Sequence, residues 1–204
     1  MFKIDLHVHT TLGGDSLIEP GELVALSLAA KLHGVCVTEH HSFFVSEPFD
    51  EISRTTGFPI FRGLEYHAAE GHLLVFGVKA GPSDLPRNLP MQQAVDWVGG
   101  RGGVAIPAHP YQKDLLGGSL GDRVLDLRGV VAREVVNGSL LPEQNQRALE
   151  AATRLEVHGI GGSDAHGPTV LGRAYTGFPD PIRTMEELVV ALRNGGYVTA
   201  WNGG

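Results

Sequence analysis

Residues 2–9 read FKIDLHVH, an apolar run that ends in two histidines, His7 and His9. In a β-strand, side chains two residues apart point to the same face, so these imidazoles project together from the end of the strand. Imidazole suits zinc, iron and manganese, and two imidazoles on one face can share an ion. A solvated pair of strand histidines has the same spacing, so this interpretation depends on the rest of the chain.

Short apolar runs alternate with helical patterns along the whole chain. We predict strands over Phe2–His9, Gly34–Thr38, Pro59–Glu65, His72–Val78, Gly103–Ala108, Val130–Asn137, His158–Gly162 and Tyr197–Trp201. Helices are predicted over Pro20–Leu32, about Pro90–Gly99, Pro142–Val157 and Thr184–Asn194. Pro20 and Pro142 suit first-turn positions, where a missing N–H costs nothing. Thr184 and Glu187 resemble a capping box, and Gly195 ends that helix.

The placement of polar residues decides between two architectures. Strand–helix alternation favours parallel strands, arranged as an open doubly wound sheet or as a barrel. An open sheet gathers functional groups at one switch point, whereas a barrel brings many strand ends to one mouth. Polar side chains end five different runs here: His7 and His9, Glu65, His109, Asn137, and Asp164 and His166. We therefore expect one α/β domain over residues 1–204, a distorted (β/α)7 TIM-like barrel with a metal site at the C-terminal ends of the strands.

Composition limits the partners. The net charge is −7, and the basic residues are scattered, which disfavours a broad nucleic-acid surface. No stretch reaches the 18 or so apolar residues that a membrane span needs, and the N-terminus lacks a secretory pattern. We expect a cytoplasmic protein without a membrane partner, in which the single cysteine, Cys36, is a buried core residue. The oligomeric state is not predicted.

Two carboxylates extend the histidine pair. Asp15 follows two glycines, which let the backbone fold its carboxylate over the site, although a turn or helix-cap role fits equally well. Glu65 ends a predicted strand. A carboxylate among imidazoles can bridge two cations about 3.5–4 Å apart, and burying it without cations would cost several kcal/mol.

Other histidines offer alternatives. His40 and His41 are adjacent, so they face opposite sides of a strand and at most one is a ligand; we choose His40. His67 and His72 compete for another position, for which we favour His72. His109 lies between prolines that fix its backbone. Asp164 and His166 share a strand face by the same period of two. The predicted metal ligands are His7, His9, Asp15, His40, Glu65, His72, His109, Asp164 and His166.

In their order and spacing these motifs resemble the PHP (polymerase and histidinol phosphatase) superfamily of phosphoesterases. The resemblance spans residues 5–166 and rests on DLHVHT at 5–10, Asp15, Thr38–His40, Gly63–Glu65, His72, His109–Pro110 and Gly162–His166. The chain departs from the usual pattern at Glu39 and His41, where members often carry Asp. Only 43 residues separate Glu65 from His109, which leaves little room for the lid-like insertion of some short members.

The resemblance implies a distorted seven-stranded barrel with two or three divalent ions, which are zinc, manganese or iron. One ion would be held by His7, His9, Glu65 and Asp164. Glu65 would bridge to a second ion on His72 and His109, and a third would lie on Asp15, His40 and His166.

These ions predict hydrolysis of a phosphate ester in a small phosphorylated substrate or a nucleotide. Water bound to zinc ionises near pH 7, and the resulting hydroxide would attack phosphorus. Asp164 or His166 would shuttle the proton, and Arg173 would clamp the phosphate, with Lys113 a weaker candidate. Asn137 either orients ligands or makes a turn. Whether the substrate is a monoester or a diester is not predicted.

Two other classes stay open. An amidohydrolase-like enzyme would cleave a C–N or C–O bond, but such sites often use a bridging carbamylated lysine, and no lysine ends a predicted strand here. A noncatalytic metal-binding PHP domain is the other alternative, against which the complete set of ligand candidates argues.

Overall fold

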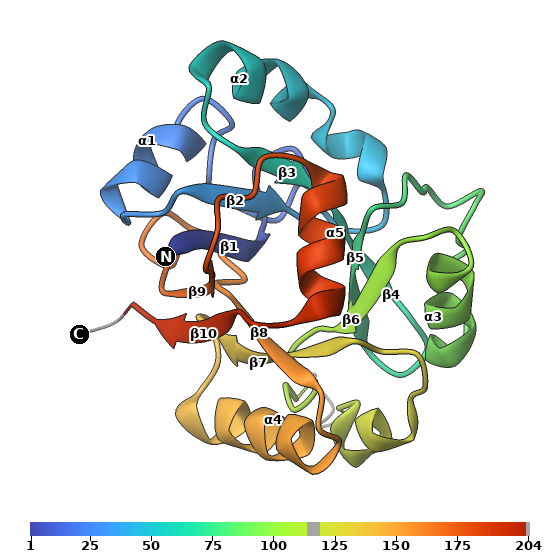
Figure 1. Cartoon of the computed structure of the whole chain (residues 1–204). Helices are drawn as coiled ribbons and strands as arrows, with labels where there is room; N and C mark the ends of the chain where they lie inside the picture. Colours follow the sequence, from blue (N-terminus) through green and yellow to red (C-terminus); the bar gives the residue numbers. More distant parts are fainter. Residues whose placement is uncertain (114–118, 203–204) are drawn as a thin grey trace.

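The computed structural model describes residues 1–113 and 119–202, with strands in the middle and helices α1 to α4 around them (Figure 1). The strands are β1 Phe2–Val8, β2 Gly34–Val37, β3 Ile60–Arg62, β4 Leu64–His67, β5 His72–Phe76, β6 Val104–Pro107, β7 Ala132–Asn137, β8 His158–Gly162, β9 Ala174–Phe178 and β10 Val198–Trp201. The α-helices are α1 Leu23–Ala29, α2 Pro48–Thr56, α3 Met91–Gly99, α4 Pro142–Arg154 and α5 Met185–Asn194, with short 3-10 helices at Phe43–Ser46 and Gly121–Asp126.

The strands pair in three sheets, with the orders β10-β9-β1-β2-β3, β4-β5-β6 and β7-β8. Pairing is parallel among β1, β2 and β3 and between β7 and β8, and antiparallel elsewhere. Two single parallel bridges, Val8 with Ala165 and His40 with Glu65, connect segments beyond these sheets. The mixed α/β class is therefore confirmed. A closed (β/α)7 barrel is not, because pairing within the described residues does not run round a full ring.

Short connections explain the antiparallel sheet. Only residues 68–71 join β4 to β5, which is enough for a hairpin and far too little for a parallel crossover. The predicted run Pro59–Glu65 is divided at Gly63, so that β3 pairs with β2 and β4 pairs with β5. These features place the start of β5 beside the end of β4, at the same edge of the fold.

Other expectations were confirmed or corrected element by element. Thr184 caps α5 through Glu187 as expected, Gly195 ends that helix, and Pro142 opens α4. The first helix begins at Leu23, so Pro20 lies before it and the expected boundary was wrong. Strand β9 and helix α2 were missed.

One core cluster draws on many strands. It contains Ile4, Leu6, Cys36, Leu74, Ile106, Ile160 and Phe178, from β1, β2, β5, β6, β8 and β9. The expected burial of Cys36 is confirmed. Since apolar burial contributes about 25 cal/mol per Å², this shared core holds the sheets against one another and fixes where their ends meet.

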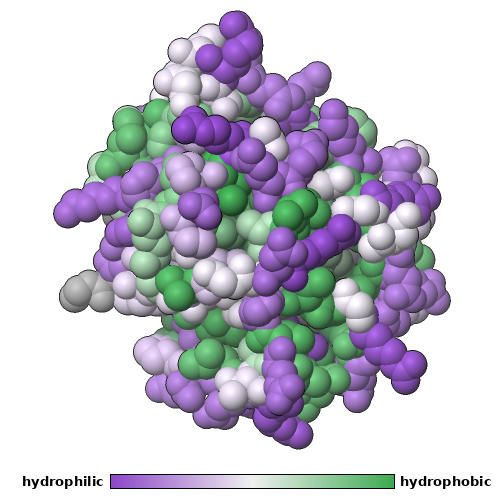
Figure 2. Space-filling view, viewed as in Figure 1, coloured by the Kyte–Doolittle hydropathy of each residue, from purple (hydrophilic) through white to green (hydrophobic). Residues whose placement is uncertain are grey.

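The outer surface is mixed. On the face drawn in Figure 2, hydrophobic areas are separated by hydrophilic ones. No helix within the described part of the chain is long and apolar enough to span a bilayer.

Candidate metal centre

The structure brings all nine predicted ligand side chains into three overlapping groups. Within each group the candidate ligand atoms lie within 4.8 Å of one another. The inner group is His7, His9, Glu65 and Asp164; the second is Glu65, His72 and His109; and the outer is His9, Asp15, His40 and His166. Their metal-binding roles stay a prediction, but the spatial meeting on which they depend is present.

The inner group has the dimensions of a tetrahedral ion site. His7 Nε2 lies 3.1 Å from His9 Nε2 and 3.3 Å from both Glu65 Oε2 and Asp164 Oδ1. His9 Nε2 lies 3.2 Å from Glu65 Oε2 and 3.4 Å from Asp164 Oδ1. A tetrahedron with edges of about 3.3 Å has its centre about 2.0 Å from each corner, which matches a zinc–nitrogen or zinc–oxygen bond. The residues therefore fit a divalent cation.

The second group begins on the other oxygen of Glu65. Glu65 Oε1 lies 2.8 Å from His72 Nδ1 and 2.9 Å from His109 Nε2. Glu65 Oε2 is buried and has no hydrogen-bond partner, which is the arrangement expected of an oxygen that faces a cation. The two oxygens of one carboxylate thus face two groups, as a bridging ligand requires.

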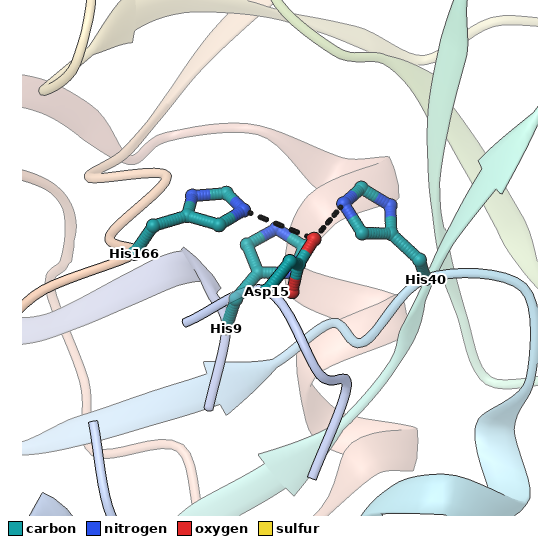
Figure 3. A group of neighbouring side chains, drawn as sticks. All are labelled: His9, Asp15, His40 and His166. Carbon is teal, nitrogen blue, oxygen red and sulfur yellow. Dashed lines mark ion pairs between the residues drawn. The ribbon is translucent and has the colours of Figure 1, made fainter. Parts of the chain in front are cut away.

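The outer group surrounds Asp15. Its Oδ2 lies 3.0 Å from His40 Nε2 and 3.5 Å from His166 Nε2, and Figure 3 shows it between these two rings. The loop before Asp15 passes close to the interior, because a Cβ on Gly13 would lie 2.3 Å from Glu39 Oε2. The small residue at position 13 thus allows the loop to carry Asp15 over the site.

The positions of the side chains distinguish His40 from His41 and His72 from His67 as candidate ligands. His41 has a φ of 67° and its ring lies 6.3 Å from that of His67, whereas His40 contacts Asp15 and Glu65. His67 is exposed and belongs to no group of candidate ligands within the described residues, whereas His72 does.

Asp164 and His166 lie at the site, but not because they share one face of a strand, as the sequence had predicted. Both follow β8, and Asp164 has a φ of 52°, so they do not share a regular strand face. The backbone N–H of Asp164 donates to the His7 carbonyl at 2.7 Å. This approach needs Gly162, since a Cβ there would lie 2.5 Å from the Cβ of His7. The two side chains consequently join different groups.

Three buried carboxylates outside the predicted set lie behind the ligands. Asp5 accepts the backbone N–H groups of Ser163 and Gly172, and burial raises its pKa to about 6. Glu39 accepts from Thr10, and its other oxygen lies 3.9 Å from His9 Nδ1. Glu134, on β7, accepts from His7 Nδ1 at 2.9 Å. Sequence reasoning missed Glu134; the available signal was a charged residue within an apolar strand run.

The charges of the inner group are strongly coupled. Burial lowers the pKa of His9, but Asp164 and Glu65 outweigh it and raise the pKa to about 9. The pKa of His7 is also raised, because Asp164, Glu134 and Glu65 oppose its desolvation. Although burial opposes it, the imidazoles lower the pKa values of Glu65 and Asp164. The pocket therefore favours positive charge, whether protons or cations supply it.

The predicted phosphate-binding residues are less close to the ligands. Arg173 is exposed, and its Nε donates to the carbonyl of Thr169 at 3.0 Å. Lys113 lines a cavity of about 360 Å³ that also borders His72 and His109. Asn137 fits both alternatives: its Nδ2 lies 3.3 Å from Asp164 Oδ2, and its Oδ1 accepts the backbone N–H of Ser139.

Residues 142–197 match the family model described as PHP-associated. An uncharacterized protein of Methanocaldococcus jannaschii is 26% identical over 135 residues, which cover 61% of this chain and 76% of that protein.

Solved structures share the fold at about 20% identity. A candidate metal-dependent phosphoesterase of Bifidobacterium adolescentis is 20% identical, with a TM-score of 0.68 over 93% of this chain and 96% of that one. A two-domain Bacteroides vulgatus protein containing a predicted PHP-like metal-dependent phosphoesterase is 20% identical, with a TM-score of 0.71 over 98% of this chain and 64% of that one. An amidohydrolase of Chromobacterium violaceum, with bound sulfate and no metal, is 17% identical, with a TM-score of 0.67 and 98% of both chains covered. The resemblance to PHP proteins is thus confirmed by the family match and the shared fold.

Proposed function

We propose that this protein is a metal-dependent hydrolase that cleaves a phosphate ester at a site for two or three ions of zinc, manganese or iron. The observation that carries the proposal is the inner group, in which five separations of 3.1–3.4 Å join two imidazole nitrogens and two carboxylate oxygens, a spacing that suits one tetrahedral ion. Glu65 supports a second ion on its far oxygen, and the outer group supports a third.

When bound, such cations lower the pKa of a water molecule and neutralise charge on phosphate oxygens. The chain supplies the geometry. The two oxygens of Glu65 belong to different groups, so this side chain fixes the position of one group relative to the other. The side-chain amide of Asn137 donates to Asp164 Oδ2 and orients that carboxylate. Asp164 Oδ1 lies 3.6 Å from His166 Nδ1, and His166 is partly open to solvent, so we assign the proton transfer to this pair.

The cavity of about 360 Å³ gives the substrate a place beside the second group. Lys113 and Arg123 line it together with His67 and His72. Cationic side chains around a pocket of this size suit a small phosphorylated compound or a nucleotide. Arg173 stays a prediction as an additional phosphate contact.

We propose that the three observed sheets are segments of the distorted seven-stranded barrel of PHP proteins, with the metal centre at one end of that barrel. Support comes from the bridges at Val8 and His40 and from the core cluster that several strands share. The cytoplasmic location expected from the sequence stays a prediction.

An amidohydrolase-like reaction is the second candidate, since one structure of this fold is named as an amidohydrolase. Amidohydrolase-like sites often use a bridging carbamylated lysine, whereas none of the four lysines of this chain, Lys3, Lys31, Lys79 and Lys113, ends a strand. That difference favours the phosphoesterase.

A substrate panel tests the proposal. The metal-free protein is loaded with manganese, zinc or iron and assayed on phosphomonoesters, phosphodiesters, amides and lactones. We expect turnover of a phosphate ester that disappears in His7→Ala and persists in His33→Ala, a histidine outside the groups. Turnover of only an amide or lactone would favour the second candidate, and equal phosphoesterase activity in both variants would refute the site.

A further inference from the structure

A buried carboxylate that belongs to no ion group joins two of the groups from behind. Glu134 lies on β7 and is 1% exposed. It makes three hydrogen bonds: Oε1 accepts from His7 Nδ1 at 2.9 Å, and Oε2 accepts from the backbone N–H of His109 at 2.7 Å and from Asn137 Nδ2 at 3.0 Å. Each partner belongs to the metal centre or supports it.

The bond to His7 selects a tautomer. A carboxylate accepts only, so His7 keeps a proton on Nδ1, and the Nε2 lone pair is the one that an inner ion would use after displacing any proton there. That nitrogen is the atom from which the distances to Glu65 and Asp164 are measured. Glu134 therefore fixes both the protonation and the ring orientation that an inner ion needs.

The other oxygen acts on the second group through the backbone. His109 has a φ of 28°, an unusual value for a residue with a side chain, and its N–H is held by Glu134 Oε2. The same oxygen accepts from Asn137, whose amide also reaches Asp164 Oδ2 at 3.3 Å. One carboxylate thus connects a ligand of the second group with two ligands of the inner group.

We propose that Glu134 is a positioning residue that sets the inner and second ion groups jointly, while the outer group forms independently of it. The inference rests on the proposed metal centre and adds a residue that binds no ion. Asp15 and His40 make none of the hydrogen bonds recorded for Glu134, which explains why the outer group is excluded.

Substitution by glutamine exposes this role because the amide has one acceptor and one donor end. Three donors face the carboxylate, and no orientation of an amide can accept from all of them. With its NH₂ toward His7, the amide favours the Nε2–H tautomer, which cannot bind the inner ion through Nε2. With its NH₂ toward His109, the amide places a donor against the backbone N–H of His109, and the hydrogen bond at that position is lost.

The experiment compares wild-type protein, Glu134→Gln and a matched exposed variant, Glu143→Gln. Zinc affinities and stoichiometry are measured by competition with a chelating dye, and ¹⁵N NMR of the zinc-loaded proteins reports the tautomer of His7. We expect Glu134→Gln to weaken two of the ions by about ten- to a hundredfold and to lose the Nδ1–H signature, with the remaining ion unchanged. Glu143→Gln should match the wild type.

Wild-type zinc affinities together with an unchanged His7 tautomer in Glu134→Gln would overturn the inference. Should that variant fail to fold, Glu134→Asp keeps the charge on a shorter side chain, and we expect it to weaken the same two ions by a smaller factor. Wild-type affinities in Glu134→Asp would count against the inference. Zinc binding without phosphoesterase turnover would refute the proposed function alone, and a wild-type protein that binds no zinc would refute both.

Discussion

The inner and outer groups share the His9 ring yet differ sharply in their surroundings. The side chains of His7, His9 and Glu65 are at most 1% exposed, whereas those of Asp15 and His166 are 40% and 39% exposed. The inner ligands lie on strands or within two residues of a strand end, and Glu134 holds His7 from behind through a hydrogen bond of 2.9 Å. Asp15 instead stands on a loop.

This difference predicts two kinds of ion site within the proposed metal centre. A site in a low-dielectric interior, with its ligands locked by hydrogen bonds, needs little reorganisation and excludes water, so its ion is held tightly. A site open to solvent, with a ligand on a loop, binds more weakly and exchanges faster. We expect the inner ion to be permanent and the outer ion to depend on the metal concentration.

The largest effect should come from Glu65→Gln. This change removes the charge that both the inner and the second group use, so two ions lose affinity together. We expect a loss that exceeds the hundredfold or so typical of supporting residues. Elemental analysis of the dialysed protein should find at most one ion per chain. Retention of two or more ions in the variant would contradict the bridging role.

The next largest effect should be a pH dependence of ion affinity that differs between the inner and outer groups. With a pKa of about 9, His9 holds a proton at pH 7 that an inner ion must displace. Inner-site affinity should therefore rise by about tenfold per pH unit between pH 6.5 and 9 for each displaced proton. Burial lowers the pKa of His40 to about 4, so His40 releases none in that range. Calorimetry in buffers of different ionisation enthalpy counts the protons released.

The same pKa values predict how the metal-free protein behaves. Because the folded pKa of His9 lies above its unfolded value, its contribution to stability is complete below about pH 6.5 and is lost as pH rises through 9. Added zinc should remove this loss, since the cation replaces the proton. Thermal unfolding of the metal-free and zinc-loaded forms at pH 6 and 9 checks this; an equal effect of pH on both forms would contradict it.

A smaller effect is expected for Asp15→Asn. It leaves the inner group intact and weakens only the outer ion, by about tenfold, because one charged ligand of an exposed site is lost. Titration with manganese, followed by electron paramagnetic resonance, should show one weaker site and unchanged tight sites. Weakening of all sites would show that the two regions are not independent.

The smallest effect is expected for His67→Ala. His67 is exposed and its ring lies 4.7 Å from that of His72, outside every ion group described above. Metal stoichiometry and affinity should stay at wild-type values, whereas His72→Ala should lose the second ion. The reverse result would exchange the roles of the two histidines.

The sequence could predict what local periodicity controls. The spacing of His7 and His9 on one strand and the cap of α5 at Thr184 depend on neighbours in the chain, and both were found. Most of the ligand candidates stood out because they are polar residues at the end of an apolar run, a pattern with little use elsewhere in a core, whereas Asp15 lies on a loop and His72 begins β5.

What sequence reasoning missed depends on distant partners. Strand β9 is short and contains a glycine, and it is a strand because it pairs with β1 and β10. The division at Gly63 follows from competing pairings of β3 and β4. Glu134 has no motif of its own, and its role emerges only when β7 brings it to His7, 127 positions away.

One measurement tests the central claim most directly: a crystal structure of zinc-soaked protein with anomalous diffraction at the zinc edge. We expect an anomalous peak about 2.0–2.2 Å from His7 Nε2, His9 Nε2 and Glu65 Oε2, and a second peak on the Oε1 side of the same carboxylate. Zinc that binds elsewhere, or a Glu65 carboxylate that contacts no ion, would contradict it.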